Sequence, residues 1–254
     1  MIIGIILAAG KGTRIKAKTA NKVTLPFLNK PLILYSVELM EKVADKTFVV
    51  IGAFHESVKK VLAHKKVFYA YQKKRLGTGH AVKVAIEEIV KKKIRPEIVL
   101  VGYGDHTMFY KKEDIKKLIA FHQKEKAAMS IITTDSDNNE KLHWGYILRD
   151  EKNNIIDSVE YKDASDEIKK NTKELNAGFY CFDFNFLINN LKKIPKSKVT
   201  GEYYINSLIK IASDQSLDVI GLKVPFSSVG IGVNTWSELD ESQKIYLAVK
   251  NNEI

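Results

Sequence analysis

Short apolar runs alternate with segments of helical periodicity through the first half of the chain, and this alternation constrains the fold more than any other feature. The opening run, Met1–Ile6, is continuous rather than alternating, as expected of a central strand in a parallel sheet. The expected strands are Ile2–Leu7, Thr47–Ile51, Val67–Ala70, Ile98–Val101 and Ala128–Thr133. The expected helices are Leu32–Lys42, His55–Ala63, Gly79–Val90 and Lys112–Lys124. Repeated β-α-β units predict an α/β fold with a doubly wound, mainly parallel mixed sheet and right-handed crossovers.

The pattern changes from about His143, where the expected strands become shorter and the turns more polar. These strands are Gly145–Leu148, Ile155–Tyr161 and Ala177–Phe182. They predict a smaller mixed β insertion or lid rather than an independent domain. A helix near Glu202–Ser213, a strand near Val219–Val224 and a last helix from Thr235 to about Lys250 follow, and Thr235 with Glu238 has the spacing of a capping box.

The formal net charge of +11 raises the possibility of nucleic-acid binding. The lysines, however, come as scattered pairs without interleaved aromatics or a nucleic-acid-binding motif, which favours solvated helix faces. We therefore expect no nucleic-acid partner, although the charge should attract small anionic substrates. Cys181 is the only cysteine and lies in an apolar run, as a buried thiol would. Without disulfides, a signal peptide or a long apolar span, the sequence predicts a cytoplasmic protein with no membrane partner.

The segment Leu7–Arg14, Leu-Ala-Ala-Gly-Lys-Gly-Thr-Arg, follows the first expected strand directly. Small residues let the backbone approach a ligand, glycines can turn amide groups toward an anion, and Lys11 and Arg14 add positive charge. The segment indicates a cradle for nucleotide phosphates, and the alternative is an ordinary strand-to-helix turn. Neither the third glycine of a dinucleotide fingerprint nor a Walker loop is present, which disfavours a nucleotide-dependent oxidoreductase.

Other polar residues lie where they could complete this site. Lys22 follows the glycine turn at loop distance and can reach back over it. Gln72 and the segment Leu76–Ala81 follow the third expected strand, and they suit recognition of the polar edge of a base unless Thr78 merely caps the next helix. Asp105 follows the strand Ile98–Val101 and is the best candidate for a Mg²⁺ ligand, with a turn aspartate as the alternative. His106 and His143 lack the spacing of zinc ligands.

Together these segments resemble the sugar-1-phosphate nucleotidylyltransferases, and most closely the uridylyltransferase domain of bacterial UDP-N-acetylglucosamine pyrophosphorylases. The resemblance rests on motifs that occur in family order over essentially the whole chain. They are LAAGKGTR at Leu7–Arg14, Lys22, Gln72 with LGTGHA at Leu76–Ala81, YGD at Tyr103–Asp105, EYKDAS at Glu160–Ser165, NAG at Asn176–Gly178, TGEYYI at Thr200–Ile205 and GVN at Gly232–Asn234.

The resemblance implies transfer of a nucleotidyl group from UTP to a sugar 1-phosphate, N-acetylglucosamine 1-phosphate in the closest relatives, giving a UDP-sugar and pyrophosphate. It implies catalytic roles for Arg14, at the pyrophosphate, and Lys22, at the α-phosphate, and Mg²⁺ ligation by Asp105 and Asn234. The implied nucleotide-binding residues are Ala8, Ala9, Gly10, Gly12, Thr13, Gln72, Gly77 and Thr78. The implied sugar-binding residues are Tyr103, Gly145, Glu160, Lys162 and Asn176.

The resemblance also implies a single Rossmann-like nucleotidyltransferase domain over residues 1–254. A nucleotide-binding part covers about 1–140, a sugar-binding part about 141–234, and a C-terminal helix 235–254. The hexapeptide-repeat region that follows this domain in bifunctional relatives does not follow here, so we expect no acetyltransferase half. The sequence favours no particular oligomeric state.

The chain departs from the family pattern at three places. Asn21 stands where a proline usually precedes the lysine, Thr107 replaces the proline after Gly-Asp-x, and His143-Trp144-Gly145-Tyr146 replaces Gly-Tyr-Gly-Arg. The last departure lies beside the implied sugar site and therefore bears on which sugar is used. The open alternatives are a sibling enzyme that uses CTP, TTP or another sugar phosphate, and a non-catalytic regulatory homologue of the same fold.

Overall fold

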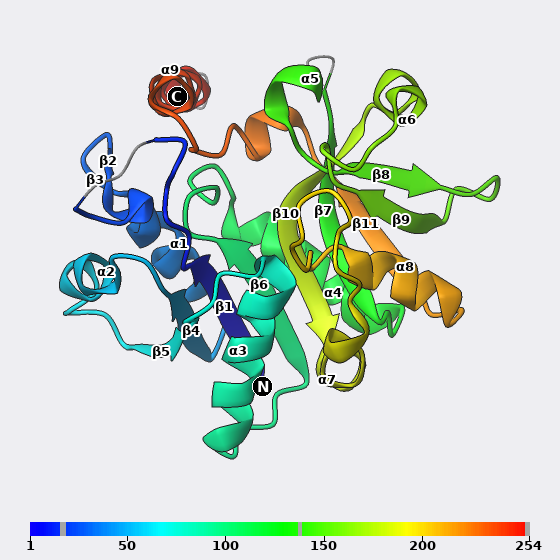
Figure 1. Cartoon of the computed structure of the whole chain (residues 1–254), viewed down its shortest axis with the longest axis horizontal. Coiled ribbons are helices and arrows are strands. Elements are labelled where there is room, and N and C mark those ends of the chain that lie inside the picture. Colours follow the sequence, from blue (N-terminus) through cyan, green and yellow to red (C-terminus); the bar gives the residue numbers. More distant parts are fainter. Residues whose placement is uncertain (16–18, 137–138, 252–254) are drawn as a thin grey trace.

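The computed structural model describes residues 1–15, 19–136 and 139–251, and it shows an α/β architecture built on one large sheet (Figure 1). The strands are β1 Ile2–Ala8, β2 Pro26–Phe27, β3 Lys30–Pro31, β4 Lys46–Ile51, β5 Val67–Tyr71, β6 Ile98–Tyr103, β7 Met129–Asp135, β8 Tyr146–Arg149, β9 Ile155–Val159, β10 Glu174–Asp183 and β11 Val219–Lys223. The helices are α1 Leu32–Met40, α2 His55–Val61, α3 Thr78–Lys91, α4 Lys112–Lys124, α5 Asn139–Leu142, α6 Asp166–Asn171, α7 Phe184–Asn190, α8 Ser207–Asp214 and α9 Trp236–Asn251, with short 3₁₀ turns η1 Lys22–Thr24, η2 Leu191–Lys193 and η3 Phe226–Ser228.

The main sheet has the strand order β11-β7-β10-β6-β1-β4-β5. The pairs β1–β4, β1–β6, β4–β5 and β7–β11 are parallel, whereas β10 runs antiparallel to both β6 and β7. The predicted doubly wound, mainly parallel mixed sheet is therefore confirmed. Because β10 is reversed, its first residues lie at the edge where its neighbours β6 and β7 end.

Helices cover both faces of the sheet, because consecutive strand residues point to opposite faces and both sets are apolar. One face packs Ile3, Ile5 and Leu7 of β1 against buried residues of α3, α7 and α8. The other packs Ile6 and Ala8 of the same strand against residues of α1, α2 and α4. The opening apolar run thus forms a central strand that is buried on both sides, as its sequence predicts.

The smaller β region expected after His143 extends the main sheet rather than forming a sheet of its own. Its strand β8 pairs with β10 through Leu175 and Tyr146, and β9 pairs with β8. Farther along the chain, α9 packs on the loop that carries β2 and β3 through a cluster that includes Phe27, Leu239 and Tyr246. Figure 1 shows this helix standing apart from the sheet at the upper edge of the molecule.

Most expected elements are present within a few residues of their predicted bounds, and the helix predicted for Glu202–Ser213 is the main exception. In the structure α8 begins only at Ser207. The preceding backbone is held elsewhere: Tyr203 N donates to Leu76 O at 2.8 Å, and Gly79 N donates to Tyr203 O at 2.8 Å. These bonds fix the backbone of Tyr203 in an extended pairing, so the helix cannot include it.

Within the described ranges, the structure contains no helix with both the length and the apolar character needed to cross a bilayer. Cys181 is fully buried in β10, and this burial raises the pKa of its thiol. The predicted buried thiol is therefore confirmed.

Candidate functional site

Polar and charged side chains gather where β1 and β6 end, at the carboxyl edge of the parallel strands. Gly104 N donates to Leu7 O at 3.0 Å, which holds the loop after β6 against the end of β1. Loops after neighbouring parallel strands meet at this edge, which is where ligands bind in open α/β sheets. The chain thereby brings the glycine turn and Asp105 to one place, as the sequence predicts.

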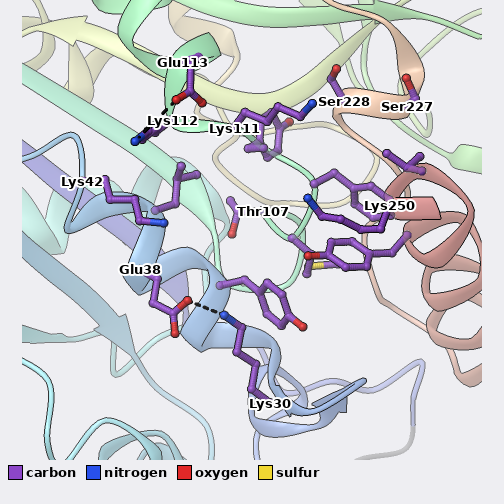
Figure 2. Close-up of a pocket in the computed structure, with 17 residues that line it drawn as sticks. Lys30, Glu38, Lys42, Thr107, Lys111, Lys112, Glu113, Ser227, Ser228 and Lys250 are labelled. Atoms are coloured by element: carbon purple, nitrogen blue, oxygen red, sulfur yellow. Dashed lines mark hydrogen bonds and ion pairs between the residues drawn. The ribbon is translucent and has the colours of Figure 1, made fainter. Parts of the chain in front are cut away.

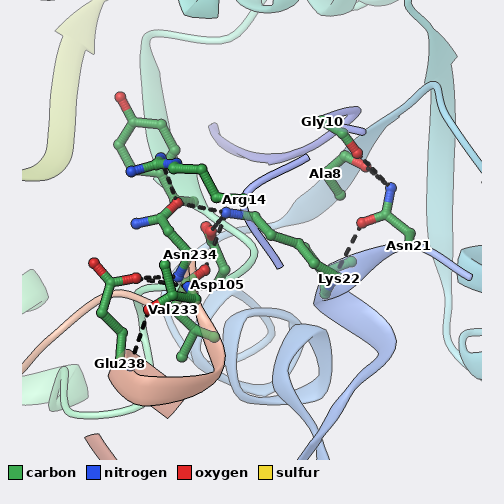
Figure 3. A network of polar contacts seen from close by, with 12 residues as sticks. Ala8, Gly10, Arg14, Asn21, Lys22, Asp105, Val233, Asn234 and Glu238 are labelled. Atoms are coloured by element: carbon green, nitrogen blue, oxygen red, sulfur yellow. Dashed lines mark hydrogen bonds and ion pairs between the residues drawn. The ribbon is translucent and has the colours of Figure 1, made fainter. Parts of the chain in front are cut away.

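Arg14, Lys22, Asp105 and Asn234 meet at this edge and are here called the cation cluster (Figure 3). Lys22 Nζ forms an ion pair with Asp105 Oδ2 and donates to Asn234 Oδ1 at 2.7 Å and to Val233 O at 3.0 Å. Arg14 Nη2 donates to the same Asn234 Oδ1 at 2.8 Å. The Lys22 and Asp105 side chains are only 15% and 13% exposed, so their attraction is screened less than that of a surface pair. Lys22 and Asn234, which are 212 positions apart in the sequence, thus contact each other directly.

The Asp105–Asn234 pair fits a magnesium ion. Both oxygens already contact a single cation, the Lys22 ammonium, so they lie close enough to contact one ion together. Carboxylate and amide oxygens are suitable Mg²⁺ ligands, and this ion usually takes only one or two protein ligands, the others being water and phosphate. In the described part of the chain, no three His, Cys, Asp or Glu side chains are grouped so that they could hold a metal ion by themselves. The donor set therefore suits an ion shared with a phosphorylated ligand.

Glu238 holds Asn234 in place, a role that the sequence analysis did not assign to it. Its Oε2 accepts hydrogen bonds from Asn234 N and Thr235 N, both at 2.7 Å, while Glu238 N donates to Thr235 Oγ1 at 3.1 Å. The predicted capping box at the start of α9 is therefore confirmed. The capping-box spacing of Thr235 and Glu238 was visible in the sequence. Because this capping box directly follows Asn234, it could have indicated that Glu238 also holds Asn234.

The glycine turn after β1 combines a buried start with an open tip. Ala8 and Ala9 are buried, whereas Gly10, Thr13 and Arg14 are exposed. A methyl group added at Gly10 would meet nothing within 4 Å, so the space beside it is open. Gly12 has φ +65°, a conformation that favours glycine. The turn therefore offers backbone and positive charge beside a free volume, as a phosphate cradle requires.

The loop between β5 and α3 contains the predicted base-binding residues, and much of its hydrogen bonding is internal. Gln72 is buried, and its Nε2 lies 3.2 Å from Gly77 O and 2.9 Å from His80 Nδ1. Gly77 has φ +102°, and a Cβ there would lie 2.5 Å from Tyr203 O, so only glycine fits. Thr78 does not act as an N-cap; it is the first residue of α3, and its Oγ1 accepts from Ile205 N at 2.9 Å. The segment Leu76–Ala81 thus joins the end of this loop to the first turn of α3, and Tyr203 and Ile205 brace it.

A cavity of about 170 Å³ adjoins the cation cluster. Of the predicted sugar-binding residues, Tyr103, Gly145, Glu160 and Asn176 line it together with Asp105 and Asn234. Lys162 is exposed and is not among the lining residues. The structure therefore brings together four of the five predicted sugar-binding residues next to both predicted metal ligands.

Glu160 contributes an acidic group to this cavity. Burial, followed by the charges of Asp163 and Glu202, raises the pKa of its carboxyl to about 7. The protonated form of this carboxyl is therefore favoured more than in an ordinary glutamate. When protonated, the carboxyl can donate a hydrogen bond to a ligand hydroxyl, and when ionised it can only accept one.

A buried polar network fixes the far wall of the cavity. Asn176 Nδ2 donates to Tyr180 OH at 2.9 Å and to Ser158 Oγ at 3.3 Å, while its Oδ1 accepts from Gly178 N at 2.9 Å. Gly178 has φ +75°, and a Cβ there would lie 2.6 Å from the Tyr103 ring. Glycine at this bulge in β10 thus lets Tyr103 pack against the strand and face the cavity.

The departure at His143-Trp144-Gly145-Tyr146 supplies lining residues that the sequence analysis did not assign. His143 and Trp144 both line the cavity. The Trp144 ring packs on His106 with centroids 4.6 Å apart, and the His143 ring packs on Tyr161 at 4.4 Å. Tyr146, in contrast, is fully buried in another cluster beside Leu175. The departure thus changes the aromatic lining of the cavity at two positions.

A larger cavity, of about 520 Å³, lies elsewhere, between α1, the start of α4 and α9 (Figure 2). Lysines dominate its charged lining, and Lys30 pairs with Glu38 there. None of the predicted site residues lines this space. The cation cluster and its adjoining cavity, rather than this larger cavity, therefore form the candidate site.

These features define the chain as a doubly wound α/β protein with a cation-bearing polar site at the carboxyl edge of its parallel strands. Within that class, the sequence matches the family described as "Nucleotidyl transferase" over residues 3–228, and the chain belongs to this family. The family resemblance expected from the motifs is thereby confirmed.

Curated relatives agree with this family, and a solved structure agrees with the fold. The "Bifunctional protein GlmU" of Caldicellulosiruptor saccharolyticus is 38% identical over 92% of this chain and 50% of its own length. The "Bifunctional protein GlmU" of Clostridium kluyveri is 36% identical over 95% of this chain and 51% of its own. The chain thus spans about half the length of these curated relatives. A crystal structure of UDP-glucose pyrophosphorylase complexed with UDP-glucose superposes with a TM-score of 0.75 at 21% identity, covering 98% of this chain and 99% of that one, which confirms the fold.

Proposed function

We propose that this protein transfers a nucleotidyl group from UTP to a sugar 1-phosphate, releasing pyrophosphate and a UDP-sugar. The observation that carries this proposal is the cation cluster, in which Lys22 joins Asp105 and Asn234 beside the open glycine turn. A nucleoside triphosphate needs positive charge along its phosphates, and the adjoining cavity offers room for an acceptor next to them. The family membership supports the same reaction type.

The reaction needs no nucleophile from the protein. A phosphate oxygen of the sugar 1-phosphate forms the new bond to the α-phosphorus of UTP, and the bond from that phosphorus to the β-phosphate bridging oxygen breaks in line. Lys22 would leave its present partners to bind the α-phosphate, while Arg14 and the backbone of the glycine turn would hold the departing pyrophosphate. The protein then contributes position and charge stabilisation. Asp105 and Asn234 would hold Mg²⁺, whose chemistry is to neutralise charge on the reacting phosphates.

The two substrates would occupy different parts of one domain. Residues 1–140 supply the glycine turn and the loop braced around Gly77, which we assign to the nucleotide. Residues 141–234 supply Gly145, Glu160 and Asn176, which we assign to the sugar. For the sugar itself we propose N-acetylglucosamine, because the motif order is closest to the uridylyltransferase domain of bacterial UDP-N-acetylglucosamine pyrophosphorylases.

Pyrophosphate release over a grid of nucleoside triphosphates and sugar 1-phosphates, with and without Mg²⁺, tests the proposal. We expect the highest turnover with UTP, N-acetylglucosamine 1-phosphate and Mg²⁺. Glucose 1-phosphate belongs in the grid because the similar solved structure is a UDP-glucose pyrophosphorylase complexed with UDP-glucose. Release from another pair would revise the substrates, and no release from any pair would refute the proposed reaction and favour a non-catalytic homologue.

A further inference from the structure

We propose that Asn21 is a positioning residue, whose buried side chain fixes the glycine turn relative to Lys22. This inference rests on the proposed nucleotidyl transfer. It assigns a role to a residue that contacts neither the candidate metal ligands nor the cavity, but lies between the two segments that would hold the phosphates.

The side-chain amide of Asn21 is fully buried and points at backbone oxygens of the glycine turn. Its Nδ2 donates to Ala8 O at 3.1 Å and to Gly10 O at 3.0 Å, and a third acceptor, Ala53 O, lies at 2.8 Å (Figure 3). Ala8 ends β1, Gly10 is the open residue of the turn, and Ala53 belongs to the loop after β4. One amide group therefore contacts three backbone oxygens on two segments, the glycine turn and the loop after β4.

The same residue fixes the start of the short 3₁₀ turn that carries Lys22. Its Oδ1 accepts from Val23 N at 3.2 Å, and its main-chain oxygen accepts from Thr24 N at 2.9 Å. Its main-chain N–H donates to Ser57 Oγ at 2.9 Å, which anchors the turn to α2. Both ends of the side chain are thus engaged, one with the glycine turn and one with the turn of Lys22.

These bonds also set the direction of an amide group in the glycine turn. In a planar trans peptide, the C=O and the following N–H point in opposite directions. Because Gly10 O points at Asn21, the N–H of Lys11 must point away from it. Asn21 thereby fixes the orientation of a backbone donor in the turn proposed to hold pyrophosphate. It also fixes the backbone of Lys22, the proposed ligand of the α-phosphate.

Removing a buried amide can lower the stability of the fold without affecting catalysis directly. The test therefore needs, as a control, another buried amide that lies far from the glycine turn. Asn190 at the end of α7 is buried, and its Nδ2 likewise donates to a backbone oxygen, Phe186 O, at 2.9 Å. It follows β10, whose last residues lie at the edge of the sheet opposite the end of β6, and Figure 1 shows α7 there. Asn21→Ala and Asn190→Ala remove matched buried amides, and only the first lies between the glycine turn and the turn that carries Lys22.

We would measure kcat, the KM for each substrate and the melting temperature for both variants. Misplacing a phosphate ligand by about 1 Å can cost about 100-fold in rate, so we expect Asn21→Ala to lower kcat by roughly 10- to 100-fold. The KM for the sugar phosphate should stay within about twofold of wild type, because the cavity is untouched. Asn190→Ala should lower the melting temperature without lowering kcat. Equal effects of the two variants on kcat, measured where both are folded, would overturn the proposal.

A second variant guards against misfolding of Asn21→Ala. Asn21 has φ −71°, close to the roughly −65° that proline requires, so Asn21→Pro keeps this backbone angle. It removes the side-chain amide together with the main-chain N–H that donates to Ser57 Oγ. We expect a similar loss of kcat, and wild-type kcat in folded Asn21→Pro would overturn the proposal. Hydrogen exchange over residues 9–12 and 22–25 should be faster in Asn21→Ala than in Asn190→Ala, whichever reaction the protein catalyses. If the wild-type protein releases no pyrophosphate, only the proposed function is refuted. If hydrogen exchange over these residues is unchanged in Asn21→Ala, the proposal that Asn21 fixes the turn is refuted.

Discussion

Lys22→Ala offers the sharpest test of the cation cluster, with Lys11→Ala as its matched control. The two lysines flank the same turn, but their surroundings differ. Lys22 is 15% exposed at its side chain and contacts Asp105, Val233 and Asn234, whereas Lys11 is exposed at the turn. If positive charge near the turn were all that mattered, both substitutions would have similar effects.

The expected magnitudes follow from these surroundings. Removing one preorganised donor to a reacting group typically costs about 3–4 kcal/mol, or roughly 10²–10³ in turnover, and we expect this for Lys22→Ala. An exposed charge such as Lys11 is worth at most about 1 kcal/mol, or roughly fivefold. Lys22→Ala also leaves the Asp105 carboxylate, whose side chain is 13% exposed, without its ion pair. We therefore expect it to destabilise the fold by about 1–3 kcal/mol, which is less than the cost for a fully buried pair.

Two measurements separate these effects. Pyrophosphate release at saturating UTP and sugar phosphate gives kcat, and thermal unfolding with and without Mg²⁺ gives the stability. Mg²⁺ should raise the melting temperature of Lys22→Ala more than that of Lys11→Ala, because the ion replaces the lost ammonium beside Asp105. Equal losses of kcat in the two variants would show that the assignment of Lys22 to the α-phosphate is wrong.

Three further changes probe the metal pair, the cavity and the turn. Asp105→Asn keeps the shape but not the charge, so we expect at least a roughly 10²-fold loss of Mg²⁺-dependent turnover with a native circular dichroism spectrum; near-normal turnover would argue against the metal site. Because the pKa of Glu160 is raised to about 7, its favourable contribution is full below its usual pKa and is lost as the pH rises through 7. Raising the pH from about 5 to about 8 should therefore destabilise Glu160→Gln by about 1–3 kcal/mol less than it destabilises wild type. Urea unfolding at each pH measures this, and an equal loss of stability in both proteins would contradict the prediction. Gly10→Ala adds a methyl group in open space, so unfolding should be unchanged while the KM for UTP rises about 10-fold or more; an unchanged KM would place the phosphates elsewhere.

The sequence predicted what depends on local pattern. The continuous apolar run of β1 is buried on both faces, and the capping box of Thr235 and Glu238 begins α9. The motifs also indicated side chains that come together in the fold, since Asp105 and Asn234 both contact Lys22.

What the sequence did not predict depends on contacts between distant segments. The prediction of a helix around Tyr203 was wrong because the backbone of Tyr203 hydrogen-bonds to Leu76 and Gly79, more than 120 residues earlier. Thr78 was open to interpretation as a cap, yet its hydroxyl accepts from Ile205 N instead. Asn21 was visible only as a departure from the family pattern, since nothing local shows that its side chain reaches Ala8 and Ala53.

The reversed direction of β10 has a consequence for how such a protein can diversify. In a purely parallel sheet, a segment that enters a strand reaches it at the edge opposite the ligands. Here the segment that leads into β10, including α6, arrives at the ligand-bearing edge and delivers Asn176 there. Changes of length or composition in that segment can therefore reshape the cavity beside the cation cluster while the glycine turn and the hydrophobic interior stay as they are.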